Sequence, residues 1–155
     1  MRQALAARRG EVKVAHATTR LGPRQIRRIE WAIAEAERGH RGEIRVHVEG
    51  RYTGDGPIAR AAAVYHALGM DRTRDDTAAL LYIALDDRKV AVWHGAGLAG
   101  AADERFWSGV TEAVAAGFRA GRPAEGIAQA VAEMGRVMLK AAPGEDVRGN
   151  ELPNT

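Results

Sequence analysis

The sequence predicts a single α/β domain in which helices cover a small mixed β-sheet. Residues 43–49 alternate apolar and polar side chains, as a strand with one buried face does. Apolar residues recur at helical spacing before and after that segment, and a second extended apolar stretch follows at 77–85. Because a strand–helix–strand order favours parallel strands joined by a right-handed crossover, the sheet is predicted to begin with a parallel pair.

The elements follow in order along the chain. Pro23 suits the first turn of a helix, and Gly39 offers a left-handed stop after it. Asp86, Asp87 and Arg88 form a tight turn, so the strands on either side of them are predicted to pair antiparallel. The predicted strands are 43–49, 77–85 and 89–93, and the predicted helices are 23–38, 58–68, 103–120 and a last one that ends before Pro143.

Length and charge suggest one domain with two polar ends. The chain has 155 residues, which suits a single domain spanning 22–143. Residues 1–28 hold eight basic groups and one acidic group, so we expect 1–21 to be a basic, partly disordered arm and 144–155 to be a polar tail. The arm either contacts a membrane surface or is simply solvated. Nucleic acid is disfavoured because no aromatic side chain precedes Trp31.

Composition excludes several classes of protein. The chain has no cysteine, which rules out disulfides, thiolate metal sites and cysteine nucleophiles. Its longest strongly apolar run, residues 78–85, falls far short of the roughly 20 residues that span a bilayer. The basic N-terminus contains no apolar signal core, so a cytoplasmic location is expected, with peripheral membrane association left open.

Strand directions predict that acidic residues gather at one end of the sheet. This end collects Glu43, Asp75 and Asp76, and Asp103 follows the nearby loop. Carboxylate and carbonyl oxygens suit hard cations, so Glu43, Asp75, Asp76 and Asp103 are candidate ligands for calcium or magnesium. His94, Gly95, Gly97 and Gly100 would shape that site. The alternative is ordinary structure, with a solvated loop at 75–76, a helix cap at Asp103 and a strand-edge charge at Glu43.

Residues 95–100, which we call the glycine loop, match the G-x-G-x-x-G pattern of dinucleotide-binding proteins. The strand before it belongs to a hairpin, however, and Asp103 and Glu104 open the next predicted helix. Their carboxylates would repel a phosphate at the helix N-terminus. We therefore expect Gly95, Gly97 and Gly100 to form a tight turn with positive φ angles instead.

The sequence contains few candidates for a nucleophile or a general acid. Ser108 is the only serine and lies inside a predicted helix rather than on a strained turn. His94 is either a general acid or a partly buried, hydrogen-bonded residue. Arg45, His47 and Glu49 make one face of strand 43–49 polar, which suggests an edge strand or an open docking face.

Three segments carry a resemblance to a known family. They are residues 42–49 (GEIRVHVE), 80–84 (LLYIA) followed by Asp87-Arg88-Lys89, and the closing 150–153 (NELP). In this order they resemble the TPM domain family, specifically its compact stand-alone bacterial branch. The resemblance covers about residues 22–155.

The resemblance implies a three-layer α/β/α sandwich with a partly Rossmann-like layout. It also implies diverse biochemistry, since a thylakoid-lumen relative linked to photosystem II repair is described as an acid phosphatase, while others bind calcium or associate with membranes. Ala96 and Ala99 stand where the family often has Tyr and Glu.

Two functions follow as hypotheses. The first is a cation-binding, non-catalytic interaction or assembly domain whose partner is a protein or a membrane surface. The second is a metal-dependent hydrolase of phosphomonoesters, which would use a bridging metal to bind the phosphoryl group.

Overall fold

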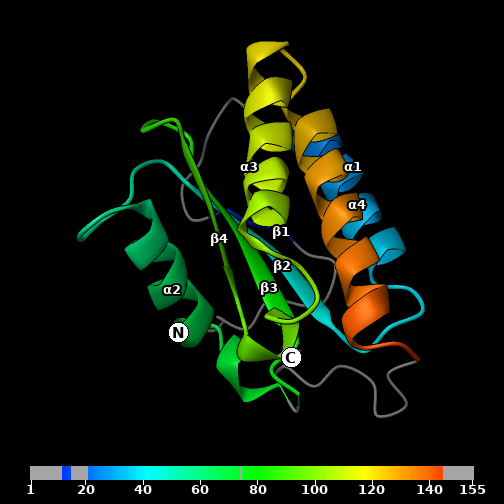
Figure 1. The fold of residues 1–155 in the computed structure, drawn as a ribbon. Coiled ribbons are helices and arrows are strands. Elements are labelled where there is room, and N and C mark those ends of the chain that lie inside the picture. The colour runs from blue at the N-terminus through cyan, green and yellow to red at the C-terminus, as the bar shows by residue number, and fades with distance from the viewer. Residues whose placement is uncertain (1–11, 15–20, 74, 145–155) are drawn as a thin grey trace.

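A computed structural model describes residues 12–14, 21–73 and 75–144 of the chain (Figure 1). The described residues contain four strands and four helices, with two short 3-10 helices, η1 and η2. The elements are β1 (Val12–Val14), α1 (Pro23–Ala36), β2 (Glu43–Glu49), α2 (Pro57–Ala67), η1 (Met70–Arg72), β3 (Ala78–Ala84), β4 (Lys89–His94), η2 (Ala96–Leu98), α3 (Glu104–Arg119) and α4 (Pro123–Ala141).

The strands form one mixed sheet in the order β1-β2-β3-β4. β1 and β2 are parallel, β2 and β3 are parallel, and β4 returns antiparallel to β3. The α/β class, the mixed sheet and the hairpin after residue 85 are therefore confirmed. The register pairs Glu43 with Ala78 and Ala79 with His94, so these strand ends lie at one end of the sheet.

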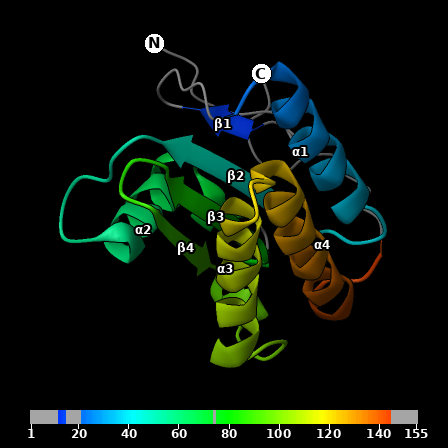
Figure 2. The same ribbon diagram turned by 90° about the horizontal axis from the view of Figure 1, so that it is seen from above.

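Helices lie on both faces of the sheet (Figure 2). Ile44, Val46 and Val48 pack into one core with residues of α1, α3 and α4. The other face of β3, including Leu80 and Tyr82, packs against α2. Because β3 is buried on both faces, its sequence is a continuous apolar run rather than an alternating one.

Two sequence-based expectations about the sheet are wrong. Residues 12–14, assigned to the arm, form β1 and pair with residues 46–48 of β2. β2 is consequently an internal strand, and Arg45, His47 and Glu49 are 2–6% exposed rather than displayed on an open face. A three-residue strand is too short to show an alternating pattern. The other residues of the arm, and 145–155 of the tail, lie outside the described residues.

Local chemistry explains where the helices begin and how closely they pack. Proline occupies the first turn of α1, α2 and α4, and the Asp103 side chain caps α3. α3 and α4 touch through two glycines, since a Cβ on Gly117 would lie 2.5 Å from the Cα of Gly126. In the described part of the chain, no helix is both long and apolar enough to cross a membrane.

Candidate functional site

The end of the sheet that holds the predicted ligands brings three chain segments together. The Glu43 amide donates to Thr77 O at 3.1 Å, and the Gly95 amide donates to Ala78 O at 2.9 Å. The Gly97 amide donates to Asp76 O at 3.0 Å. Thus the start of β2, the segment before β3 and the glycine loop meet as the strand directions require.

Asp76 fastens the glycine loop to α2. Its Oδ2 accepts the Ala96 amide at 2.8 Å, and its Oδ1 accepts the Tyr65 hydroxyl at 3.3 Å. Asp76 itself takes a left-handed backbone conformation, with φ of 53°. Burial raises the pKa of Tyr65, and the nearby Asp76 charge raises it further, so the hydroxyl stays protonated as a donor.

The glycines of this loop serve a different purpose from the one expected. Gly95, Gly97 and Gly100 do not have positive φ angles; Gly95, for example, has φ of −79°. Instead, a Cβ on Gly95 would lie 2.2 Å from Asp76 O, and one on Gly97 would lie 2.2 Å from Asp75 O. Close approach of backbone therefore requires glycine at 95 and 97, whereas Gly100 has open space around it.

The other three predicted ligands have separate roles. Asp75 forms an ion pair with Arg41 at 2.7 Å. Asp103 accepts the Phe106 amide at 3.0 Å as the cap of α3. The side chain of Glu43 is fully buried. Its Oε2 lies 3.8 Å from Nη1 of Arg45, two residues later on β2.

The described side chains do not converge as the ligands of a metal ion do. Among residues 12–14, 21–73 and 75–144, no group of three or more histidine, aspartate or glutamate side chains is arranged to hold a metal ion. Calcium and magnesium need several converging oxygen ligands, so an ion here would require Asp75 to leave its present partner, Arg41. The cation stays a prediction from the sequence.

His94 lies beside the glycine loop. Its ring stacks on Trp107, with centroids 4.6 Å apart and planes 19° apart. Its Nδ1 is 2.9 Å from the carbonyl oxygen of Gly95. The structure thus places His94 as a partly buried, hydrogen-bonded residue that joins β4 to α3.

A buried ionic cluster at the opposite end of β2 was not anticipated. Glu49 is 3% exposed and accepts Arg60 Nε at 2.9 Å and Arg60 Nη2 at 3.0 Å. It also accepts the Tyr82 hydroxyl, and His47 Nε2 lies 3.3 Å from it. Burial alone would raise the pKa of Glu49, but the hydrogen bonds from Arg60, Tyr82 and His47 and the charge of Arg60 lower it to about 2.

The exposed side of α1 carries arginine and tryptophan together. We call Arg24, Arg27, Arg28 and Trp31 the α1 basic face. Trp31 is 62% exposed, and the Arg28 guanidinium lies 5.8 Å from the centroid of its ring. Arg28 also binds Glu125 of α4 through two hydrogen bonds of 3.0 and 3.1 Å. In the sequence, Trp31 lies off the apolar stripe that Ile26, Ile29 and Ile33 form at helical spacing, and this position is a signal for the surface.

Similar folds occur among solved bacterial structures. The chain matches the BA42 protein of the psychrophilic bacterium Bizionia argentinensis with a TM-score of 0.74 and 29% identity, over 87% of this chain and 92% of that one. It matches the N-terminal domain of a P. gingivalis protein with a TM-score of 0.69 and 20% identity, over 84% and 83%. The N-terminal domain of the cg2496 protein of Corynebacterium glutamicum gives 0.66 and 12%, over 94% and 90%.

No curated protein matches the sequence. A family model described as the TPM domain matches residues 14–137, which run from the end of β1 into α4. This span includes the glycine loop, the Asp76 contacts and the Glu49 cluster. The family predicted from the sequence is thereby confirmed, although the motif at 150–153 lies outside the matched span and the described residues: the chain belongs to the TPM domain family.

Proposed function

We propose that this TPM domain is a non-catalytic interaction module that binds an acidic protein surface through the α1 basic face. The observation that carries the proposal is the 62% exposure of Trp31 beside the Arg28 guanidinium. Tryptophan and arginine are the residues most enriched among the few that dominate binding energy at protein interfaces. Their pairing on a solvent-facing helix supports a partner rather than a folding role.

The charge on α1 supports the same proposal. Its first turn holds no acidic residue; Arg24 is exposed in that turn, and Arg27 is exposed just after it. Cations near a helix N-terminus oppose the helix dipole, each at a cost of about 0.3–1 kcal/mol. That placement does not stabilise the fold, but it would stabilise a complex with an acidic partner. Acidic side chains on such a partner complement the arginines and speed association.

A panel of defined probes tests this proposal. We would titrate the ¹⁵N-labelled full chain with an acidic peptide that contains leucine and glutamate, and with its lysine counterpart. The acidic peptide is expected to shift the α1 amides and the Trp31 indole signal. Trp31→Ala is expected to weaken this binding about tenfold. Ile58→Ala is the matched control, since Ile58 is 61% exposed on α2, and it should leave the affinity unchanged.

Two results would reject the acidic-protein partner. The first is an absence of shifts on α1 with the acidic peptide. The second is binding to phosphatidylglycerol vesicles with no response to the peptide, which would identify a membrane surface instead.

The cation part of the function is a separate proposal. A calcium or magnesium ion at Asp75 and Asp76 would require Arg41 to leave Asp75, because the two now lie 2.7 Å apart. Calcium titration of the wild type and of Asp75→Asn, followed by thermal unfolding, tests this. A calcium-dependent rise in Tm that the variant lacks would support it. An unchanged Tm in both would reject it, and metal-dependent hydrolysis of p-nitrophenyl phosphate would favour the phosphatase hypothesis.

A further inference from the structure

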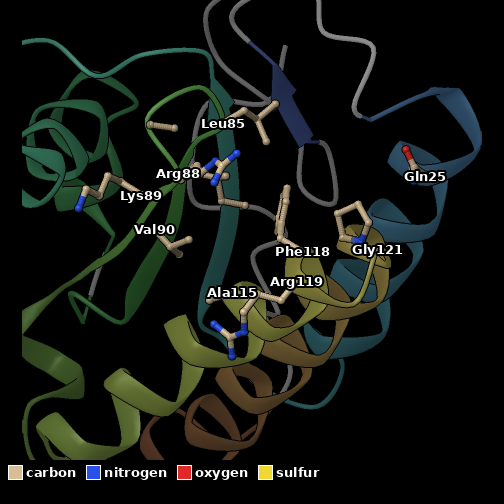
Figure 3. Close-up of a pocket in the computed structure, with 12 residues that line it drawn as sticks. Gln25, Leu85, Arg88, Lys89, Val90, Ala115, Phe118, Arg119 and Gly121 are labelled. Carbon is tan, nitrogen blue, oxygen red and sulfur yellow. The ribbon is translucent and has the colours of Figure 1, made fainter.

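A cavity of about 700 Å³ lies between the β3–β4 turn and the turn that joins α3 to α4 (Figure 3). This volume is within the range of pockets that hold small organic ligands. Its floor is apolar: Ile83 and Leu85 are each 2% exposed, and Val90 and Phe118 are partly buried against the same core. Gln25 of α1 also lines the cavity, but none of the four residues of the α1 basic face does.

The rim of this cavity is cationic. Arg88, Lys89 and Arg119 line it, and none of the described lining residues is acidic. In Figure 3 the Arg88 guanidinium lies near Leu85 and Phe118, while the Lys89 amine extends away from the cavity. Arg119 is held in an ion pair with Glu112. Arg88 makes no ion pair with any described residue, so its charge is available to a ligand.

The acidic residues of the same turn face elsewhere. Asp87 Oδ2 accepts the Tyr52 amide at 2.8 Å, and its Oδ1 lies 4.0 Å from Arg51. Asp86 lies beside Gly50, where an added Cβ would be 2.8 Å from its Oδ2. Both carboxylates therefore contact the loop after β2. The turn thus separates its charges, with acids toward that loop and Arg88 toward the cavity.

Arg88 also occupies an unfavourable backbone position. Its φ of 56° is left-handed, a conformation that glycine or asparagine usually supplies in a tight hairpin turn. A residue with a Cβ is strained in this conformation, whereas glycine is not. A strained arginine therefore lies at the rim of an apolar cavity.

We propose that this cavity binds a small organic anion, with a carboxylate against Arg88 and an apolar body against Ile83, Val90 and Phe118. The apolar floor selects for a hydrocarbon or aromatic body, and the guanidinium selects for a planar carboxylate that it can bind with two hydrogen bonds. The proposal is independent of the proposed interaction with an acidic protein surface, because the two use different residues.

The test uses decanoate as the probe and decanol as its uncharged counterpart. We would follow amide shifts of the full chain during titration with each compound. Decanoate is expected to shift amides of the β3–β4 turn and the C-terminal turn of α3, with decanol binding at least about tenfold more weakly. Equal binding of both compounds would overturn the proposal, as would an absence of these shifts at about 1 mM decanoate.

Three variants locate the interaction. Arg88→Gly removes the cation and relieves the backbone strain, so it should fold at least as stably and bind decanoate about tenfold more weakly. Ala115→Leu extends a lining side chain of α3 into the space and should also block binding. Arg51→Gln is the matched charge control from the other side of the turn and should bind as the wild type does. Unchanged affinity in Arg88→Gly would overturn the proposal.

Discussion

Replacement of Glu49 by glutamine tests the energetics of the buried cluster on β2. The substitution keeps the shape of the side chain but removes the charge that Arg60 contacts at 2.9 and 3.0 Å. Tyr82 keeps an oxygen to which it can donate. The wild-type pKa of Glu49 falls from an ordinary 4.5 to about 2. At about 1.36 kcal/mol per pH unit, and allowing for the partial exposure of Arg60, this corresponds to about 2–3 kcal/mol of stability.

The sign of the pH dependence follows from proton binding. Between about pH 2 and 4.5 the unfolded chain carries a proton on Glu49 that the folded chain does not. Stability from this residue is therefore complete above pH 4.5 and is lost as the pH falls toward 2. The Glu49→Gln variant should be about 2–3 kcal/mol less stable than the wild type at pH 7. That difference should shrink as the pH falls toward 2 and approach zero below it, where the folded wild-type carboxyl also becomes neutral.

Urea unfolding at a series of pH values measures the difference between the two proteins. Glu112→Gln is the matched control, because Glu112 pairs with Arg119 while both side chains are more than 60% exposed. The control should lose less than about 1 kcal/mol at any pH. The reasoning is refuted if the wild type and Glu49→Gln lose stability in parallel between pH 4.5 and 2.

The remaining predictions concern backbone contacts, and urea unfolding at pH 7 measures all of them. Gly97→Ala should destabilise the domain by about 2–4 kcal/mol because its Cβ would overlap a main-chain oxygen before β3, whereas Gly100→Ala should stay within about 0.5 kcal/mol. Gly117→Ala should cost about 2–3 kcal/mol by separating α3 from α4, whereas Gly109→Ala in the same helix should stabilise it by about 0.5–1 kcal/mol. Asp103→Ala should cost about 1 kcal/mol through loss of the α3 cap. Equal effects within either glycine pair would contradict the contacts described.

The sequence predicted the helices and the three longer strands because their signals are local. The alternation at 43–49 matches β2 at both ends, and Pro23 marks the start of α1 through a covalent restriction on φ. The hairpin followed from a turn-forming sequence between two apolar runs. β1 was missed because three residues carry no periodic signal, and its position depends on pairing with a strand about 30 residues later.

The candidate site was predicted less well because side-chain partners are not local. Strand direction brought Asp76 and Gly95 to one end of the sheet, as expected. It did not reveal that Asp75 pairs with Arg41, 34 positions earlier. Likewise, the sequence placed Glu49 on a polar strand face, whereas in the structure Arg60 of α2 and Tyr82 of β3 enclose it. Tertiary packing decides which charged residues pair, and the spacing of residues in the sequence does not show it.

The central position of α4 has a consequence for synthesis of the chain. This helix packs against both α1 and α3, and its buried side chains, such as Ile127, Val131 and Met134, complete the core that covers Ile44 and Val46. A ribosome produces α4 after every other described element. The apolar face of the sheet therefore stays incompletely covered until about residue 141 has emerged, and nascent chains that stall earlier should depend on chaperones to remain in solution.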